Sequence, residues 1–461
     1  MSGKILIVDD VATNRIVLKV KLAAACYDTV HTAGGANALR LARELQPDII
    51  LLEAQLRDLD GVEICRHLKA DPATCSIPVV VVTTAENAAA RMPALRAGAE
   101  DFLTKPLDEA VLLARLRSLL RAREAENELR LRDLACRDLG FAETCAPFER
   151  KGCVTLVAEP PETAARWKSE LAPHLTEKLV IARPEETLGE NLCGSCPDVF
   201  VVAADLRPAG AGLRLMSELR SRQATLHAAI CMVVAPDARD TAAVALDLGA
   251  SDIIPEGATV EEMALRIRRQ IQRKRTQDSL RASVANGLRL AVTDPLTGLY
   301  NRRFALPQLA AIAERADVTG QTFAVMILDI DRFKIVNDTW GHAAGDSVLV
   351  EVAARLRTNL RSADLIARIG GEEFLIALPD CTLESARATA ERIRRAVEEQ
   401  PVRLPHLGSE IPVTLSIGLA LGGGSRREPL AIEEVVGEAD RALLGSKADG
   451  RNQVKIGRSA A

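Results

Sequence analysis

The chain has 461 residues, of which 48% are hydrophobic, 3% aromatic and 26% charged, and its formal net charge is -4. This length is too great for one hydrophobic core and predicts about three domains of roughly 100–200 residues each. The weak negative charge excludes a bulk attraction to nucleic acid or to an anionic membrane, and no apolar run approaches the roughly 20 residues of a membrane-spanning helix.

The first predicted element is a strand within the opening MSGKILIVDD. It leaves no room for the charged and apolar regions of a secretory signal, so we expect a cytoplasmic protein without membrane insertion. The ten cysteines follow no repeating frame, which is typical of reduced thiols. Cys193 and Cys196 form one C-x-x-C pair. Because no second pair or His partner lies at zinc spacing, we interpret both as ordinary loop thiols.

Two segments about 150 residues apart resemble each other. Pro47-Asp48 and Pro197-Asp198 each precede an apolar run, and the GAED that ends at Asp101 is echoed by the GASD that ends at Asp252. Both halves alternate short apolar runs with amphipathic helical stretches. This alternation predicts a parallel, doubly wound sheet in each half.

Two helical connectors are predicted at about Leu112–Leu139 and Val260–Val292. In the second, apolar residues at helical spacing would either pack on a neighbour or form a dimeric stalk. A basic cluster in the same helix could touch nucleic acid, but no helix-turn-helix accompanies it, so we interpret it as a solvated helix face. Its members are Arg268, Arg269, Arg273, Lys274 and Arg275.

The last third of the chain has the pattern of an α+β domain with a central sheet. A buried strand ends at Asp329 and Asp331, and Glu372 and Glu373 follow two glycines in a turn that opens another strand. A Gly-Gly turn can place its carboxylates beside the end of a neighbouring strand. Converging carboxylates suit Mg²⁺, which takes a few carboxylates together with substrate phosphates.

This part of the chain resembles the GGDEF family of diguanylate cyclases over about 170 residues. The motifs that carry the resemblance lie at Asp294–Arg303, Asp329–Asp346, Gly370–Phe374, Ser416–Gly418 and Ser446–Asn452. The resemblance implies a palm-type cyclase domain that condenses two GTP molecules to cyclic di-GMP and releases pyrophosphate. Each domain would hold one GTP, and a homodimer would complete the reaction.

The resemblance also implies roles for individual residues. Asp329, Glu372 and the carbonyl of Ile330 would bind Mg²⁺ or Mn²⁺, and Glu373 would have a further acid–base or metal role. Asn337 and Asp346 would read the guanine edge, because a carboxylate accepts from guanine N–H groups that adenine does not offer. The remaining GTP-binding positions, chiefly for the phosphates, are Phe333, Lys334, His342, Lys447 and Arg451.

Arg361 and Asp364 form an R-x-x-D pattern shortly before the Gly-Gly turn. Alone the pattern would be an ordinary surface ion pair, but at this offset it resembles the site where the family binds its product as an allosteric inhibitor. Arg392 occupies the position of a supporting arginine. One small departure is Leu444, where the family often has Tyr.

The first repeat resembles a response-regulator receiver, with Asp9 and Asp10 as the acids for a metal ion and Thr83, Phe102 and Lys105 as its switch residues. The phosphoacceptor position holds Glu53 instead of Asp, and Arg57 replaces the proline of the following loop. One extra methylene moves the carboxylate about 1.5 Å outward. Two hypotheses remain open: Glu53 mimics the phosphorylated state by pairing with Lys105 and Thr83, or the receiver has lost phosphotransfer and acts as a scaffold.

The second repeat is more eroded, since Ala158-Glu159 replaces the acid pair, Ala203 the nucleophile and Glu256 the lysine. It resembles the adaptor of PleD-type cyclases, which share this receiver–receiver–cyclase order. In such proteins an adaptor arginine can bridge to product at the inhibitory site, and Arg166 is the candidate.

We therefore predict a multidomain α/β chain with two CheY-like doubly wound parallel-sheet receivers followed by an α+β palm-type GGDEF domain. The expected segments are a receiver at 1–125, a helical linker at 126–150, a degenerate receiver or adaptor at 151–275, a helical stalk at 276–293 and the cyclase domain at 294–457. The expected partners are GTP, cyclic di-GMP, a second copy of the chain and an upstream histidine kinase, with no nucleic acid.

The main alternative function is a non-catalytic cyclic di-GMP receptor or signalling scaffold that uses only Arg361 and Asp364. The acids at Asp329, Glu372 and Glu373 argue against it. A phosphorelay regulator acting on DNA would need a DNA-binding module, and the sequence offers none.

Overall fold

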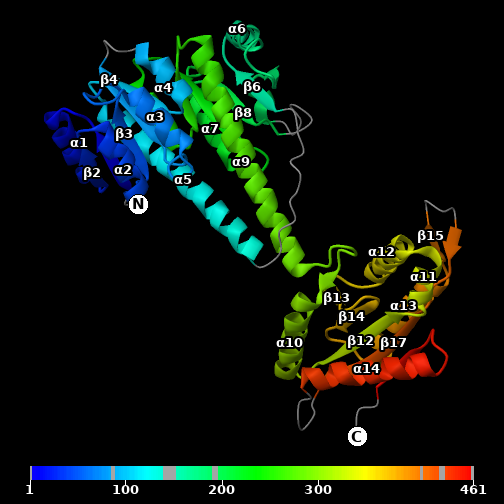
Figure 1. Ribbon diagram of the computed structural model, residues 1–461. Coiled ribbons are helices and arrows are strands. Elements are labelled where there is room, and N and C mark those ends of the chain that lie inside the picture. The colour runs from blue at the N-terminus through cyan, green and yellow to red at the C-terminus, as the bar shows by residue number, and fades with distance from the viewer. Residues whose placement is uncertain are drawn as a thin grey trace. The chain divides into compact units, whose positions relative to one another are not determined.

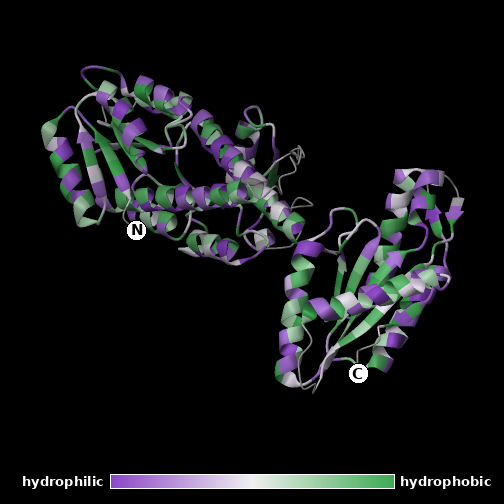
Figure 2. Cartoon of the chain, turned by 60° about the horizontal axis from the view of Figure 1, so that its bottom comes forward, coloured by the Kyte–Doolittle hydropathy of each residue, from purple (hydrophilic) through white to green (hydrophobic). Residues whose placement is uncertain are grey.

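The computed structural model describes residues 3–84, 89–138, 152–188, 196–404, 409–424 and 431–457. It divides into two compact units, Met1–Ala135 with Thr144–Ser283 and Cys136–Glu143 with Val284–Ala461. The first unit contains both receivers and the second contains the cyclase domain (Figure 1). Apolar residues are concentrated on the strands of each sheet, as Figure 2 shows.

The first receiver has a five-stranded parallel sheet in the order β2-β1-β3-β4-β5. Its helices cover both faces, because α1 and α5 pack with one set of alternate strand residues and α2, α3 and α4 with the other. The elements are β1 (Lys4–Val8), α1 (Ala12–Ala24), β2 (Asp28–Thr32), α2 (Gly35–Leu45), β3 (Ile49–Glu53), α3 (Gly61–Ala70), β4 (Val79–Thr84), α4 (Arg91–Ala97), β5 (Asp101–Lys105) and α5 (Glu109–Asp138).

The second receiver repeats this architecture with the parallel order β10-β9-β8-β6-β7. Its central strand residues are fully buried, which is why they read as continuous apolar runs. The elements are β6 (Cys153–Val157), α6 (Pro161–Leu171), β7 (Lys178–Ile181), η2 (Glu186–Leu188), β8 (Val199–Ala203), α7 (Ala211–Ser221), β9 (Ala229–Val234), α8 (Arg239–Asp247), β10 (Asp252–Pro255) and α9 (Val260–Val292). The prediction of two doubly wound receivers is confirmed.

The cyclase domain is built on a six-stranded mixed sheet in the order β11-β13-β14-β12-β17-β18. Helices α11, α12 and α13 share a core with one face of this sheet, and α10 and α14 with the other. Its elements are β11 (Tyr300–Asn301), α10 (Arg302–Thr319), β12 (Thr322–Ile330), α11 (Phe333–Trp340), α12 (His342–Thr358), β13 (Leu365–Arg368), β14 (Glu373–Leu378), α13 (Leu383–Glu398), β15 (Val402–Leu404), β16 (Ser409–Ile411), β17 (Leu415–Gly423), α14 (Ile432–Ala448) and β18 (Val454–Ile456).

The two receivers are joined by a buried cluster of ion pairs between equivalent residues of the repeat. Arg115 of α5 contacts Asp101 at 2.7 Å and Asp252 at 2.6 Å, and Arg266 of α9 contacts the same two carboxylates at 2.9 and 3.0 Å. Arg266 is only 2% exposed and also pairs with Glu262 at 3.0 Å. We call these five residues the receiver ion cluster. It makes the receivers one unit, in which α4, β5 and α5 of the first receiver face α8, β10 and α9 of the second.

The expected domain boundaries at 125/126 and 275/276 fall inside α5 and α9, so each helix belongs partly to a receiver and partly to a connector. In the part of the chain that the structure describes, no helix combines the length and apolar character needed to cross a membrane. Cys193 lies outside the described residues, and Cys196 is an exposed free thiol.

The basic cluster on α9 is a solvated face only in part, because Arg268 and Arg275 are exposed whereas Arg269, Arg273 and Lys274 are half-buried. Arg268 donates to the carbonyl of His174, and Arg269 to the carbonyl of Ala99 in the other receiver. Lys274 and Arg275 are paired with Asp278 and Glu177. These contacts connect segments far apart in the sequence, which helical periodicity alone cannot reveal.

Candidate active site

The predicted acids of the cyclase domain meet at one edge of its sheet. The antiparallel register between β12 and β14 places Asp329 opposite Glu373, and the amide of Ile330 donates to the carbonyl of Glu372 at 3.3 Å. Asp329 is 4% exposed, and the ammonium of Lys447 lies 2.6 Å from its carboxylate. The strand end and the Gly-Gly turn therefore come together as the sequence predicts.

Burial raises the pKa of the Asp329 carboxyl, and Lys447 acts in the opposite direction. The pKa of Glu372 is also raised, first by desolvation and then by the negative charge of Asp329. Two carboxyl groups whose ionised forms are disfavoured by burial and by neighbouring carboxylates make a site that a cation would stabilise.

The Gly-Gly turn is held by Arg368, whose importance the sequence analysis missed. Its guanidinium donates to the carbonyl of Gly371 at 2.7 Å and pairs with Asp294 at 3.0 Å. Thr297 donates to Asp294 at 2.6 Å, and together these bonds outweigh burial and lower the pKa of Asp294. A Cβ at Gly370 would lie 2.6 Å from the Glu373 carboxylate, so a side chain there would displace that carboxylate. The opening DPLTG motif thus supports the catalytic turn.

Asp331 has a structural role and does not join Asp329 in the acid cluster. Its carboxylate accepts from the hydroxyls of Thr414 at 2.7 Å and Ser416 at 2.6 Å, and from the amide of Asn452 at 3.0 Å. With both oxygens used and only 7% exposure, it joins β17 to the loop before β18.

The predicted guanine-reading residues lie on two consecutive helices, Asn337 on α11 and Asp346 on α12. A Cβ at Gly345 would come 2.0 Å from Asn337 Oδ1, so glycine lets Asn337 approach the first turn of α12, where Asp346 is exposed. Lys334 and His342 are exposed at the same two helices, whereas Phe333 is buried in the core.

The two predicted phosphate ligands near the end of the domain are separated from each other. Lys447 faces Asp329, while Arg451 lines a cavity of about 430 Å³ with Arg332 and Trp340. Arg332 and Arg451 both have positive φ, of 58° and 68°. This left-handed backbone is unusual for arginine, and it occurs here on two loops at one cavity.

The predicted inhibitory residues of the cyclase domain lie on one surface. The amide of Arg361 donates to the Asp364 carboxylate at 2.8 Å, and Arg392 donates to the carbonyl of Asn359 at 2.8 Å, so its side chain reaches the same loop. The Arg361 and Arg392 side chains are exposed. Arg166 belongs to the other unit.

In the first receiver, Lys105 donates to Glu53 and lies 2.9 Å from Asp9. Burial raises the pKa of Glu53 against the opposing effect of Lys105. The predicted pairing of Glu53 with Lys105 is present. Thr83 is buried but makes no hydrogen bond to Glu53 within the described ranges, so that part of the phospho-mimic hypothesis is wrong for this structure. Phe102 is buried in the core, at 5% exposure.

Asp10 pairs with Arg57 at 3.1 Å instead of turning toward Asp9 and Glu53. Within the described residues, no group of three or more His, Cys, Asp or Glu side chains is arranged to hold a metal ion. That Asp9, Asp10 and Glu53 share a metal stays a prediction; in this structure Lys105 engages Asp9 and Glu53, and Arg57 engages Asp10.

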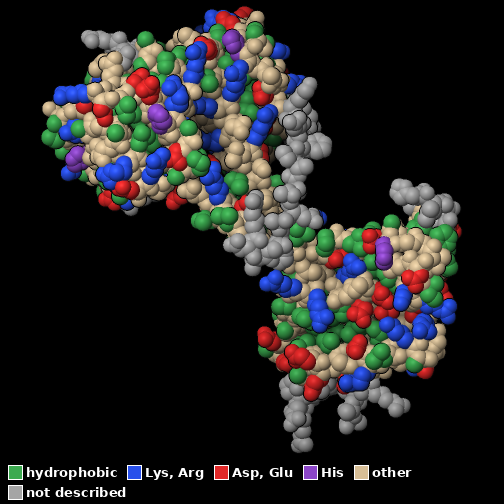
Figure 3. Space-filling view, in the orientation of Figure 1, with side chains coloured by type: hydrophobic (Ala, Val, Ile, Leu, Met, Phe, Trp, Pro, Cys, Tyr) green, Lys and Arg blue, Asp and Glu red, His purple; other side chains and the backbone are tan. Residues whose placement is uncertain are grey.

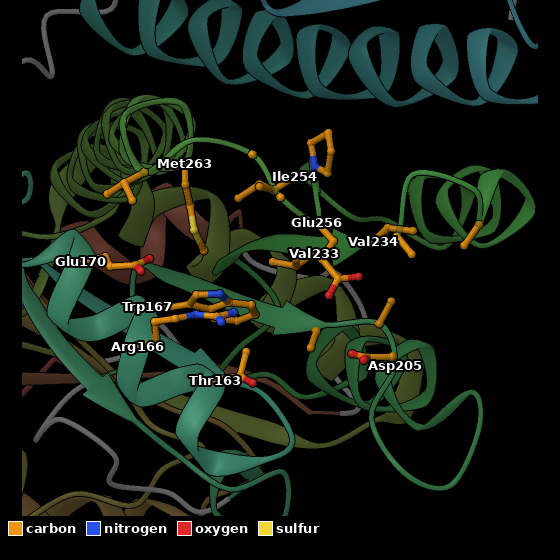
Figure 4. A pocket seen from close by; sticks show the side chains of 18 of the residues that line it. Thr163, Arg166, Trp167, Glu170, Asp205, Val233, Val234, Ile254, Glu256 and Met263 are labelled. Atoms are coloured by element: carbon orange, nitrogen blue, oxygen red, sulfur yellow. The ribbon is translucent and has the colours of Figure 1, made fainter.

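The second receiver has a cavity of about 750 Å³ where a receiver would carry its phosphorylation site. Ala203 and Glu256, at the positions of the nucleophile and the lysine, both line it. Figure 4 shows Arg166 and Trp167 of α6 in this cavity, together with Glu256 after β10 and Asp205 after β8. With Ala at the acceptor position, this receiver has no carboxylate to phosphorylate there.

Comparison with known proteins identifies the family of the chain. The family model "Response regulator receiver domain" matches residues 5–117, and "Diguanylate cyclase, GGDEF domain" matches residues 291–453. Over 462 aligned positions, covering 100% of both chains, the sequence is 38% identical to the response regulator PleD of Caulobacter vibrioides. This chain belongs to the PleD-type response regulators of the GGDEF diguanylate cyclase family.

Two further relatives resemble the cyclase domain alone. The diguanylate cyclase DgcP of Pseudomonas aeruginosa is 41% identical over 36% of this chain and 24% of its own length. The GGDEF domain of DgcB from Caulobacter crescentus, solved in complex with c-di-GMP, is 35% identical and covers 37% of this chain and 97% of its own, with a TM-score of 0.35. The PleD-type chain described here is thus a diguanylate cyclase that makes cyclic di-GMP. Enzymes of this family generally depend on a metal ion.

Proposed function

We propose that this cyclase condenses two GTP molecules to cyclic di-GMP and two pyrophosphates at a site shared by two copies of its cyclase domain. The observation that carries the proposal is the meeting of Asp329, Glu372 and Lys447 at the end of β12, beside a turn held by Arg368. Each copy would bind one GTP. The 3′-oxygen of one GTP would attack the α-phosphorus of the other, and the bond to the departing pyrophosphate would break.

The residues present fit a divalent cation of the Mg²⁺ or Mn²⁺ type. Asp329 and Glu372 provide hard oxygen ligands, the Ile330 carbonyl lies at the same strand end, and burial disfavours the two negative charges without a cation. Bound there, the metal would supply charge neutralisation for the triphosphate.

The side chains of the chain have separate tasks in this proposal. Lys447 and Arg451 bind phosphate oxygens, with Lys334 as a further cation at α11, and Asn337 and Asp346 bind the guanine edge. Glu373, paired with Asp329 across the two strands, takes a proton or supports the metal. Because one domain holds only one GTP, turnover requires a homodimer.

The receivers would control this dimerisation. Lys105 is already bonded to Glu53, an arrangement that needs no phosphoryl group, so the first receiver would favour its active arrangement without a histidine kinase. Product bound by Arg361, Asp364 and Arg392 would inhibit the enzyme, with Arg166 of the adaptor as a bridging residue. Within the cyclase domain, Arg361 and Asp364 are bonded to each other, and Arg392 of α13 donates to the carbonyl of Asn359 just before them. None of the three belongs to the acid cluster, which suits a regulatory rather than a catalytic contact.

The test is incubation of purified, product-free dimer with GTP and Mg²⁺. We expect cyclic di-GMP and pyrophosphate from the wild type and a loss of at least 10³-fold from Glu372→Gln, because a neutral amide cannot replace a metal-binding carboxylate. Glu351→Gln is the matched control, because Glu351 on α12 has a 45% exposed side chain and pairs, among the described residues, with Arg355 alone. A Glu372→Gln enzyme as active as this control would refute the site, and an inactive wild-type dimer would favour the receptor alternative.

A further inference from the structure

The two long helices of the receiver unit enclose a strongly basic cavity that has no part in the chemistry above. It has a volume of about 270 Å³ and lies between α5, α9 and the loops of the second receiver. Six basic residues line it: Arg121, Arg220, His227, Arg273, Lys274 and Arg281. Among the described residues that line it, none is acidic. Lys and Arg side chains are prominent on the face of the unit that carries α5 and α9 (Figure 3).

The protein neutralises only part of this charge. Asp278 pairs with Lys274 and, at 3.1 Å, with Arg281. Asp247 acts on Arg121 and Glu100 on Arg273 at longer range, so five permanent cations face three carboxylates. Arg121 donates through one nitrogen to the carbonyl of Leu246 at 2.7 Å. Arg273 has no hydrogen bond or ion pair with any of the residues that the structure describes.

Arg220 has mainly structural bonds, because its guanidinium donates to the carbonyls of Ala228 at 2.7 Å and Gly249 at 2.8 Å. The positive potential nevertheless acts on the neighbouring imidazole. The pKa of His227 is lowered by burial and then by the charges of Arg281 and Lys274.

A second, independent observation comes from Gln270 on α9. Its side chain lines the cavity and the residue is only 7% exposed. Its amide is open to the cavity and makes no hydrogen bond with the described residues. An amide in such a place is hydrogen-bonded to water or to a ligand. An amide donor next to partly neutralised guanidinium groups matches an anionic oxygen acceptor.

We propose that this cavity binds the di- or triphosphate group of a small molecule. Arginine presents planar, forked donors that match phosphate oxygens, and at least two adjoining phosphates are needed to balance the surplus of cations. The volume of about 270 Å³ lies just below the range of sites that enclose a whole drug-sized ligand, so the rest of a nucleotide would remain outside. Pyrophosphate, which the cyclase itself releases, and the tail of a nucleoside triphosphate share this chemistry.

Occupancy would affect the helix that leads to the cyclase domain. Arg121 lies on α5 of the first receiver and Arg273 on α9, which continues to Val292. An anion bridging these two side chains holds the two helices together and stabilises the arrangement of the receivers in which both cations face the cavity. The concentration of the phosphate ligand would therefore affect how firmly the two receivers hold together.

The experiment is calorimetric titration of the full chain with pyrophosphate, in EDTA and in a Lys447→Gln background that weakens the catalytic phosphate site. We expect saturable binding of one pyrophosphate per chain, weaker binding of orthophosphate, and loss of affinity as salt is raised. Arg273→Gln should weaken pyrophosphate by about tenfold or more, the usual effect of removing one charged hydrogen bond. The matched control is Arg132→Gln, on an exposed part of α5, whose partner within the described segments is Glu128 alone.

Gln270→Leu serves as a second variant that leaves every cation in place, and it should weaken pyrophosphate while keeping its salt dependence. Tighter binding of pyrophosphate than of GTP would assign the site to the free product, and the reverse order would assign it to a nucleotide tail. The proposal is overturned if Arg273→Gln and Gln270→Leu, both shown to be folded by circular dichroism, bind pyrophosphate as tightly as Arg132→Gln does. Absence of saturable binding in the parent protein would overturn it equally.

Discussion

The receiver ion cluster gives the sharpest prediction about stability. Arg266 lies between Asp101 of the first receiver and Asp252 and Glu262 of the second, and it is 2% exposed. Arg266→Met keeps most of the side-chain volume but removes the positive charge. Arg115 would then be the one cation shared by Asp101 and Asp252.

Removing one partner of a buried ion pair typically costs about 3–5 kcal/mol, because the charge left behind is neither hydrated nor paired. Here Arg115 still pairs with Asp101 and Asp252, and Arg91 still pairs with Glu262, so we expect a loss toward the lower end of that range. Arg96→Met is the control, since its pair with Glu261 is 58% and 52% exposed. An exposed pair of that kind contributes at most about 1 kcal/mol.

The assay is urea unfolding followed by tryptophan fluorescence. The chain has two tryptophans. In a Trp340→Phe background Trp167, which is 8% exposed, reports on the second receiver alone. If Arg266→Met lowers the free energy of unfolding by no more than Arg96→Met does, the cluster does not stabilise the receivers and the reasoning fails.

The pH dependence of the same cluster has a definite sign. Burial alone would raise the pKa of Asp101, but Arg115 and Arg266 outweigh it and lower the pKa from 3.8 to about 2. When the pKa of a carboxyl group is lower in the folded protein than in the unfolded chain, the ionised group stabilises the fold at every pH above the unfolded pKa. For Asp101 this free energy is roughly 2 kcal/mol, and it is lost as the pH falls from about 4 to 2. The difference between wild type and Arg266→Met should therefore shrink across that window. An unchanged difference at pH 2.5 would exclude Asp101 as its source.

Three further predictions concern activity and regulation. Arg361→Ala should leave the initial rate of cyclic di-GMP synthesis unchanged and raise the product concentration needed for half-inhibition by at least tenfold, since a charged hydrogen-bond donor is lost; an unchanged inhibition curve would contradict the regulatory role. Acetyl phosphate should not label Glu53, because Lys105 already engages its carboxylate, and stable incorporation found by mass spectrometry would overturn both hypotheses for this receiver. Arg368→Gln should lower kcat by about 10²-fold with little change in KM, because the Gly-Gly turn loses its support and misplaces Glu372; a rise in KM at constant kcat would instead assign Arg368 to GTP binding.

Local patterns in the sequence predicted most of the cyclase domain. The buried strand ending at Asp329 and the glycines before Glu372 indicated two strand ends at one edge, and the antiparallel pairing of β12 with β14 places them there. The sequence analysis treated Asp331 together with Asp329. Spacing alone does not show that the Asp331 oxygens accept hydrogen bonds from Thr414 and Ser416, whereas Asp329 could bind a metal ion.

Contacts between segments far apart in the chain were beyond the sequence analysis. Asp101 and Arg266 are 165 residues apart, and neither position carries a motif that names its partner. The same holds for Arg368, whose role depends on Asp294 74 residues earlier. In both cases the tertiary fold decides which carboxylate a given arginine meets.

Helix α9 has a mechanical consequence of its own. It runs without interruption for 33 residues, from Val260 in the second receiver to Val292, just before the cyclase domain. At about 1.5 Å per residue its length is about 50 Å. An α-helix advances about 1.5 Å and turns about 100° per residue, so its residue count sets the angular phase between what is attached at its two ends. One inserted residue changes that phase by more than a quarter turn, whereas seven nearly restore it. We expect coupling between receivers and catalysis to vary with the inserted length in this periodic way.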